Sequence, residues 1–211
     1  TVFNVQTGIM LQYNCPDNAI RNNTLVRQNV PDADYSYKAG FYREAPYDHT
    51  TDNVSFQYNT VVATDDRSAV FTWSNDGSIG QTGMVIDENQ YFNPFRTDGL
   101  IFGSRVNWTY PQLYTLPDWR TFSGWELHST FNASGWDFSR VSGIKPDQFV
   151  RVFMNWSGSS HEFKLGTAGF KDLKGIDISG ILRLPAYSSK VLFYSSGSLK
   201  NVDDPIYSGP K

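Results

Sequence analysis

Cysteine and charged residues are scarce in this chain. Cys15 is the only cysteine, which excludes a disulfide within the chain and a zinc site built from several cysteines. No segment approaches the roughly 20 consecutive apolar residues that a membrane-spanning helix needs. Charged residues make up 18% of the sequence with a formal net charge of −3, so there is no basic surface for a nucleic-acid backbone. We therefore expect neither a membrane nor a nucleic acid as a partner.

Aromatic residues and turn formers, in contrast, are plentiful. Phenylalanine, tyrosine and tryptophan make up 16% of the 211 residues, and the chain has 17 glycines and 10 prolines. This mixture is typical of strands joined by turns and argues against disorder. The length suits one domain, or a main domain with a small appendage.

Three segments share a degenerate repeat, in which an apolar residue precedes an asparagine and a short apolar run follows it. The segments are residues 19–26, 55–62 and 85–92. Asn23, Asn59 and Asn89 occupy the same phase of the repeat, at intervals of 36 and 30 residues. Self-similarity at such a period is typical of stacked architectures. The alternative is that three asparagine-containing strand ends coincide in a strand-rich protein.

Stacking has a physical basis in the asparagine side chain. Asparagine tolerates the left-handed backbone conformation that a tight corner between two strands needs. When successive coils of the chain lie on one another, the asparagine amides can hydrogen-bond along the stack, as polar ladders do in stacked parallel strands. The apolar residues Ile20, Phe56 and Ile86 would then form one interior row. This geometry is a parallel β-helix.

The rest of the chain divides around the predicted β-helix, and we expect an all-β fold. Its parts are β-helix coils over residues 1–115, a short helical connector over 116–130, a small C-terminal antiparallel β domain over 131–195 and a polar tail over 196–211. The connector helix begins near Leu116, with Asp118 as its cap or first-turn acid.

Two motifs in the second half of the chain resemble a known group of proteins. The first is Trp119 followed by Gly124-x-Glu126-x-His128-Ser129, and the second is Leu-Pro-Ala-Tyr-Ser-Ser-Lys-Val-Leu at residues 184–192. Secreted bacterial right-handed β-helix proteins commonly show Trp-Gln…Gly-x-Asp-x-His-Ser before a final β-domain, and Leu-Pro-Pro-Tyr-Ser-Ser-x-Val-Leu near their ends. Together with the asparagine repeats, residues 8–194 are similar to the C-terminal half of such proteins. The sequence departs from the two motifs at Arg120, Glu126 and Ala186.

The resemblance implies a right-handed coil and a carbohydrate-active function. The implied protein is an extracellular polysaccharide-degrading enzyme, secreted or periplasmic, that acts on a poly- or oligosaccharide as a glycoside hydrolase or a polysaccharide lyase. Such folds also serve as phage tailspikes and adhesins, because fold does not determine chemistry. The alternatives are therefore a non-catalytic carbohydrate-binding adhesin or tailspike-like protein, and a structural β-solenoid whose loops have no chemical role.

The first coil predicted from the sequence has no cover. Residues 1–11 run directly into strand-like sequence and contain no amphipathic helix that could act as a lid. An uncapped β-helix end exposes strand edges and core side chains. We therefore expect this chain to be the C-terminal portion of a longer protein, or a second chain to cover its first coil.

Asp65 and Asp66 form the most suggestive carboxylate pair for glycoside hydrolysis, and they are our catalytic candidates. That reaction needs two carboxyl groups about 5–9.5 Å apart across a cleft, one of them protonated. The pair follows the second repeat, where the wall of a groove would lie. Consecutive residues of an extended strand point to opposite faces, so a bend would have to bring the two together. The alternative is a solvated turn in which an aspartate caps the corner.

Residues 27–52 are a long polar and aromatic excursion from the coils, and such loops tend to carry function. Elimination by a lyase needs a cation that neutralises a uronate and a base that removes the neighbouring proton. The candidates are Lys38, Arg43 and Arg67 for neutralisation, and Tyr37, Tyr42, His49 and Lys38 for the base.

Aromatic rings complete the predicted substrate site. Tyr42 and Trp73 could stack on sugar faces, against the alternative that such rings are buried in the core. The substrate-binding candidates are Lys38, Tyr42, Arg43, Arg67 and Trp73. We expect His128 to be a hydrogen-bonded structural residue. No cofactor is expected: acidic residues could gather calcium, but the sequence has no Asp-x-Asp-x-Asp-Gly loop.

Overall fold

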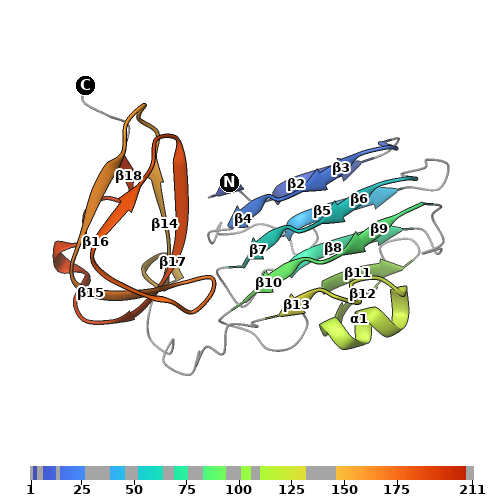
Figure 1. The fold of residues 1–211 in the computed structure, drawn as a ribbon. Helices are drawn as coiled ribbons and strands as arrows, with labels where there is room; N and C mark the ends of the chain where they lie inside the picture. Colours follow the sequence, from blue (N-terminus) through green and yellow to red (C-terminus); the bar gives the residue numbers. More distant parts are fainter. Residues whose placement is uncertain are drawn as a thin grey trace. The chain divides into compact units, whose positions relative to one another are not determined.

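In the computed structural model the chain forms two compact units, Thr1–Ala133 and Ser134–Lys211, which are described separately. The structure describes residues 2–3, 7–12, 15–26, 39–45, 52–63, 69–75, 83–93, 101–105, 110–131 and 146–207. Within these ranges, none of the helices combines the length and the apolar character needed to cross a membrane. The fold is mostly β, with parallel sheets in the first unit and a largely antiparallel sheet in the second (Figure 1).

The first unit is built from three sheets of parallel strands. The β1 sheet holds β1 (Val2–Phe3), β4 (Thr24–Val26), β7 (Thr60–Val62), β10 (Gln90–Phe92) and β13 (Thr130–Phe131). The β2 sheet holds β2 (Thr7–Gln12), β5 (Ala39–Ala45), β8 (Ala69–Asn75), β11 (Ile101–Arg105) and, antiparallel at its edge, β12 (Tyr110–Tyr114). The β3 sheet holds β3 (Ala19–Arg21), β6 (Ser55–Gln57) and β9 (Val85–Asp87). From β1 to β11, successive strands enter the three sheets in the same cyclic order, so each turn of the chain pairs with the turn before it.

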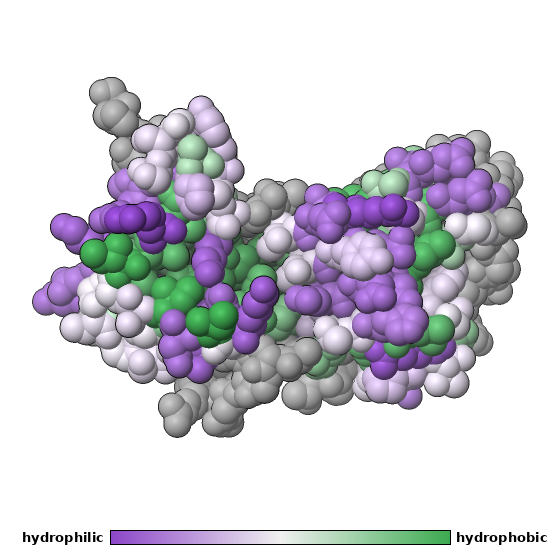
Figure 2. Space-filling view, viewed as in Figure 1, coloured by the Kyte–Doolittle hydropathy of each residue, from purple (hydrophilic) through white to green (hydrophobic). Residues whose placement is uncertain are grey.

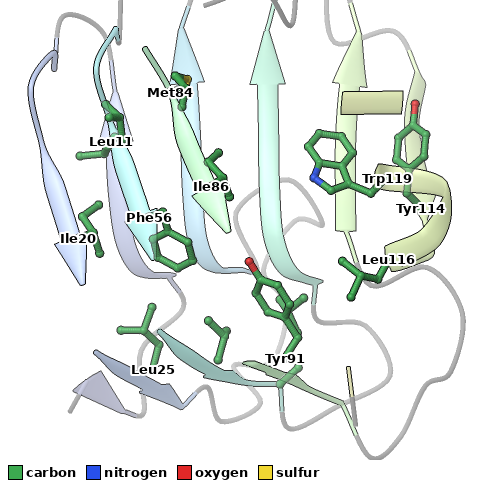
Figure 3. Close-up of a cluster of buried hydrophobic side chains, with 14 residues drawn as sticks. Leu11, Ile20, Leu25, Phe56, Met84, Ile86, Tyr91, Tyr114, Leu116 and Trp119 are labelled. Atoms are coloured by element: carbon green, nitrogen blue, oxygen red, sulfur yellow. The ribbon is translucent and has the colours of Figure 1, made fainter. Parts of the chain in front are cut away.

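Strands that pair in register place apolar side chains above one another in the core (Figure 3). Ile20, Phe56 and Ile86 are registered partners in the β3 sheet, and none is more than 9% exposed. The β1 sheet aligns Leu25, Val61 and Tyr91 in the same way. The predicted interior row is therefore confirmed. Burial of each such side chain contributes about 1.5–3 kcal/mol, so the stack of turns, and not any single three-residue strand, stabilises the unit.

Helix α1 (Leu116–Ser123) follows β12 and adds Leu116 and Trp119 to the same core (Figure 3). It begins where the sequence predicts, but its N-cap is Thr115. Thr115 Oγ1 accepts a hydrogen bond from the backbone N–H of Asp118 at 3.2 Å. Asp118 is the first-turn acid, and its Oδ2 accepts a hydrogen bond from Thr115 Oγ1 at 2.6 Å.

Thr115→Ala is expected to lower the free energy of unfolding by about 1 kcal/mol, because the first turn of α1 loses its side-chain acceptor. Urea denaturation followed by circular dichroism measures the change. Thr115→Ser keeps the hydroxyl group and should remain near the wild type. Equal losses in the two variants would contradict the capping role.

Two segments of the first unit differ from the prediction. Residues 27–52 do not simply leave the coils, because residues 39–45 form β5, which pairs with β2 on one side and β8 on the other. The β5 sequence, Ala-Gly-Phe-Tyr-Arg-Glu-Ala, lacks the alternation that identifies a half-buried strand. Proline usually breaks a strand, but Pro111 lies within β12. This strand is at the edge of its sheet, where the missing N–H of a proline is tolerated.

The second unit contains one five-stranded sheet in the spatial order β16-β15-β17-β14-β18. Its elements are α2 (Pro146–Phe149), β14 (Val150–Asn155), β15 (His161–Asp172), β16 (Asp177–Leu184), β17 (Ser188–Ser196), the 3-10 turn η3 (Leu199–Asn201) and β18 (Ile206–Tyr207). Phe153 packs edge-on against Phe163 and Phe170 in its core. Strands β14 to β17 pair with one another in antiparallel orientation and lie in the segment predicted as an antiparallel β domain, with β17 ending one residue beyond it.

The segment predicted as a polar tail from residue 196 belongs in part to this sheet. Strand β18 pairs in parallel with β14, with Met154 opposite Ile206, and the Met154 N–H donates to the Pro205 carbonyl at 2.7 Å. A two-residue strand is too short to show a periodic hydrophobic pattern. The sequence therefore carried no local signal for it.

Candidate functional site

The three repeat asparagines form a ladder between the β3 and β1 sheets. Asn59 Oδ1 accepts hydrogen bonds from the backbone N–H of Asn23 at 3.0 Å and from Asn23 Nδ2 at 3.2 Å. Asn89 Oδ1 makes the same two contacts with Asn59, at 3.0 and 3.2 Å. Asn59 Nδ2 also donates to the Ile20 carbonyl at 2.9 Å. Asn89 Nδ2 donates to the Phe56 carbonyl at 2.9 Å. The predicted stacking of the three asparagines is confirmed.

The residue in the left-handed conformation at each corner is the one before the asparagine. Asn22, Tyr58 and Glu88 have φ angles of 58°, 57° and 59°. The expectation that the ladder asparagine itself takes this conformation is wrong, because its side chain must point along the stack while its neighbour turns outward. Tyrosine and glutamate are uncommon at positive φ. Each corner therefore presents one exposed side chain beside a ladder amide, which is buried at Asn59 and Asn89 and partly buried at Asn23.

Beyond Asn89, two residues take the place of the next ladder asparagine. Ser129 Oγ accepts the backbone N–H of Asn89 at 2.8 Å, as an asparagine Oδ1 does in the other turns. Glu126 Oε2 accepts Asn89 Nδ2 at 3.2 Å and the Ser129 hydroxyl, and Glu126 Oε1 accepts the Tyr91 hydroxyl. Arg120 of α1 donates to the backbone carbonyls of Glu126, at 2.6 Å, and of Ser129. The motif that runs from Trp119 to Ser129 thus supplies the last hydrogen-bonding partners of the ladder.

Glu126 is a fully buried carboxyl group, with 0% exposure. Burial raises its pKa from 4.5 to about 7, although hydrogen bonds from Ser129, Tyr91 and Asn89 oppose the change. Burial and the neighbouring Glu126 charge raise the pKa of the Tyr91 hydroxyl well above its ordinary value. Perturbed carboxyl groups often mark catalytic sites. Here both carboxyl oxygens bind partners inside the core, so we assign Glu126 a structural role.

The same corner carries a set of outward side chains, and Figure 2 shows hydrophilic residues gathered on this side of the first unit. Arg21, Gln57 and Asp87 are registered partners at the ends of β3, β6 and β9. The residues that follow them are exposed, and Tyr58 is 55% exposed. Because neighbouring strands lie about 4.8 Å apart, these side chains form a regular row across the strands. The corner row consists of Arg21, Asn22, Gln57, Tyr58, Asp87, Glu88 and His128.

Asp87 and His128 form an ion pair at one end of the corner row. His128 Nδ1 lies 2.7 Å from Asp87 Oδ2, and Asp87 Oδ1 accepts the backbone N–H groups of His128 at 2.7 Å and Glu88 at 2.9 Å. The hydrogen bond and the charge of Asp87 raise the pKa of His128 above its ordinary value. Partial burial acts to raise the pKa of Asp87, but the hydrogen bonds from His128 and Glu88 outweigh it and the pKa is lowered. The His128 side chain is 67% exposed, so an imidazole ring oriented by Asp87 faces solvent.

The chemistry of the corner row suits a hydroxyl-rich ligand. Arg21 and His128 supply charged donors, Gln57 supplies an amide that both donates and accepts, and Glu88 supplies an exposed carboxylate. The Tyr58 ring supplies an exposed apolar face with a polar tip. These groups alternate along a direction that crosses the strands. The row can therefore contact successive units of an extended polymer.

The residues predicted from the sequence as site residues lie partly outside the described structure. Those outside the described residues are Tyr37, Lys38, His49, Asp65, Asp66 and Arg67. Tyr42 and Arg43 lie in β5 and Trp73 lies in β8. Arg43 and Trp73 are registered partners, so the structure brings these two to one position of the β2 sheet. Leu11 of β2 is at the same register position and is buried.

The Asp87–His128 pair and Tyr58 were not among the predicted site residues. The hydrogen bond expected for His128 is confirmed, but its partner was not identified. The repeat contained the signal: Ser129 aligns with Asn89, which places His128 opposite Glu88 and next to Asp87. Among the described residues, no group of three or more histidine, cysteine, aspartate or glutamate side chains is placed to hold a metal ion.

Comparison of the chain with protein-family models, with curated proteins and with solved structures gave no match.

Proposed function

We propose that the first unit is a right-handed parallel β-helix and that the chain is the C-terminal portion of a secreted or periplasmic polysaccharide-degrading enzyme. Three parallel sheets entered in cyclic order and an internal asparagine ladder support the β-helix. The two motifs that resemble secreted bacterial β-helix proteins support the carbohydrate-active function. Fold alone does not carry the function.

The corner row is the observation that carries the proposal. It exposes a tyrosine ring at 55% beside an amide, a guanidinium group and an oriented imidazole ring. Its residues repeat at the strand spacing of about 4.8 Å. This spacing suits a polymer whose sugar units stack on the tyrosine ring or form hydrogen bonds with the polar side chains. A polysaccharide bound along the row would cross β3, β6 and β9 and contact one corner after another.

We assign cleavage to the catalytic and charged residues predicted from the sequence. Asp65 and Asp66 remain the acid and base candidates for hydrolysis. For elimination, Lys38, Arg43 or Arg67 would neutralise the uronate. Both reactions use the same polymer but release different products, so product chemistry distinguishes them.

Incubation of the chain with a panel of neutral and uronate-containing polysaccharides is expected to release either new reducing ends or products with a new C=C bond that absorbs ultraviolet light. Asp65→Asn and Asp66→Asn should each lower turnover at least about hundredfold if they transfer protons. Tyr58→Ala should weaken polysaccharide binding about tenfold. Val85→Ala should not, although Val85 is also exposed on the β3 sheet. Full activity in both aspartate variants would remove them from the catalytic site. Absence of both binding and turnover would overturn the proposal.

The second candidate function is non-catalytic carbohydrate binding, as in an adhesin or a tailspike-like protein. One observation favours it: both Asp87 oxygens already accept hydrogen bonds, so this carboxylate orients His128 instead of acting as a free acid or base. Polysaccharide binding without turnover, retained in Asp65→Asn and Asp66→Asn, would support this candidate over the enzyme.

We also propose that a further coil, from a preceding part of the same protein or from a second chain, pairs with the first turn. Strands β1, β2 and β3 are the end strands of their sheets, and edge strands present unpaired backbone groups. A further turn would extend all three sheets in the same cyclic order.

A further inference from the structure

Two exposed aromatic residues follow the same end of the β14–β17 ladder in the second unit. The antiparallel ladder of β14 and β17 ends with Asn155 opposite Ser188. One residue further along each strand are Trp156, 62% exposed, and Tyr187, 78% exposed. The Tyr187 N–H donates to the Ser157 carbonyl at 3.3 Å, which keeps the two segments together past the ladder.

A buried amide fixes both segments that carry the rings. Asn155 is 0% exposed. Its Nδ2 donates to the carbonyls of Ser159, Leu184 and Pro185, at 2.7, 3.2 and 2.8 Å. Its Oδ1 accepts the N–H and the hydroxyl of Ser157, at 3.1 and 2.7 Å. One side chain thus ties the loop after β14 to the turn before β17.

Each ring also has a local contact that restricts it. Trp156 Nε1 donates to Met154 Sδ at 3.4 Å. Tyr187 has a φ of 51°, which is uncommon for a bulky residue. Its hydroxyl oxygen lies 3.3 Å from the position of a Cβ built on Gly158, so any larger residue at 158 would crowd it. Uncommon backbone conformations in well-fixed segments are concentrated at binding sites, and pre-organised rings lose little entropy on binding.

The surroundings of the rings identify the type of ligand. The loop from Trp156 to Ser160 reads Trp-Ser-Gly-Ser-Ser and the turn reads Pro-Ala-Tyr-Ser, so neither contains a charged residue. The rings offer flat apolar faces, and the serines and backbone offer uncharged hydrogen-bonding groups. An anionic or cationic ligand would find no opposite charge in these two segments, whereas a sugar ring presents C–H groups on its face and hydroxyls at its edge.

We propose that Trp156 and Tyr187 form a carbohydrate-binding site of the second unit that takes neutral sugar units of a polysaccharide. The site is separate from the corner row and does not depend on the chemistry of that row. It would hold the polymer independently of any cleavage.

Affinity electrophoresis of the full chain in native gels that contain soluble β-glucan, xylan or galactomannan tests the site. At least one of these neutral polymers should retard the wild type, and pectate serves as the anionic comparison. Trp156→Ala and Tyr187→Asn should each weaken the retardation about tenfold by loss of one ring face. Asparagine suits the positive φ at 187, so Tyr187→Asn should keep the turn folded. It therefore still tests the site if Trp156→Ala fails to fold. The matched control is Ile181→Ala, because Ile181 is 59% exposed on β16 of the same sheet.

Several results would overturn the site. No retardation by any neutral polymer would do so, as would retardation that Tyr187→Asn and Trp156→Ala both retain. If Tyr58→Ala abolishes the retardation but Trp156→Ala and Tyr187→Asn retain it, the polymer binds at the corner row and the site in the second unit is overturned. Self-association in gel filtration that disappears in Trp156→Ala would assign the rings to a second copy of the chain and overturn the sugar site.

Discussion

Asn59→Ala is expected to lower the free energy of unfolding of the first unit by about 3–5 kcal/mol. Asn59 is 0% exposed, and its amide group serves two neighbouring turns at once. The change leaves the Ile20 carbonyl and Asn89 Oδ1 without the buried Asn59 Nδ2 donor. Each unpaired buried group costs about 1–3 kcal/mol, against a total stability of about 5–15 kcal/mol for a typical domain. Urea denaturation monitored by circular dichroism measures the loss.

Two further variants make this result specific to the ladder. Asn23 is at the end of the ladder and only partly buried, so water can replace its bonds and Asn23→Ala should cost about 1 kcal/mol. Asn59→Asp keeps an acceptor oxygen but loses the donor to the Ile20 carbonyl and buries a carboxyl group, so at neutral pH it should cost at least as much as Asn59→Ala. Equal losses for Asn23→Ala and Asn59→Ala would mean that the ladder does not stabilise the stack.

The ladder could be predicted from the sequence because one residue type must recur at one phase. An asparagine amide donates and accepts along the stack, and no other common side chain of that length does both from a fixed group. The same repeat predicted the interior row of Ile20, Phe56 and Ile86, because register transfers burial from one turn to the next. The spacing of the repeat in the sequence was therefore enough to predict the described parallel sheets that contain it.

Other features of the structure could not be predicted from the asparagine repeat. Ser129 and Glu126 replace one asparagine by two side chains three residues apart, which a search for asparagine cannot find. Strand β5 mixes glycine and adjacent charged residues, so its role as a central strand follows only from its pairing. Trp156 and Tyr187 come to the same end of the second unit through the β14–β17 register. Tyr187 belongs to the motif at residues 184–192, but nothing in the sequence links it to Trp156. Where tertiary pairing decides the position of a residue, local pattern is a weak guide.

Glu126→Ala is expected to destabilise the first unit by about 3–5 kcal/mol, because three polar groups lose a buried acceptor. These groups are the Tyr91 hydroxyl, the Ser129 hydroxyl and Asn89 Nδ2. Glu126→Gln keeps the shape of the neutral acid and should lose far less at pH 5. The comparison separates the shape and hydrogen bonds of the side chain from its charge. Similar stability of Glu126→Ala and the wild type would contradict the structural role.

The charge of Glu126 should appear as a pH dependence of stability. Burial raises its pKa from 4.5 to about 7, so the folded state holds the proton more tightly than the unfolded chain. For an acid with a raised pKa, the stabilising contribution is complete below 4.5 and is lost as the pH rises to about 7. This difference corresponds to about 3 kcal/mol between the two ends of the window.

The difference between the wild type and Glu126→Gln, measured by denaturation from pH 5 to pH 7.5, isolates this contribution. The wild type should lose stability over this range relative to the glutamine variant.

The other nearby groups with shifted pKa values are present in both proteins. The lowered pKa of Asp87 matters only below its ordinary value of 3.8, and the raised pKa of His128 matters only above 6.5. Parallel stability curves for the two proteins would show that Glu126 does not change its charge in the folded state, and the ladder would then be closed by a permanently ionised or permanently neutral group.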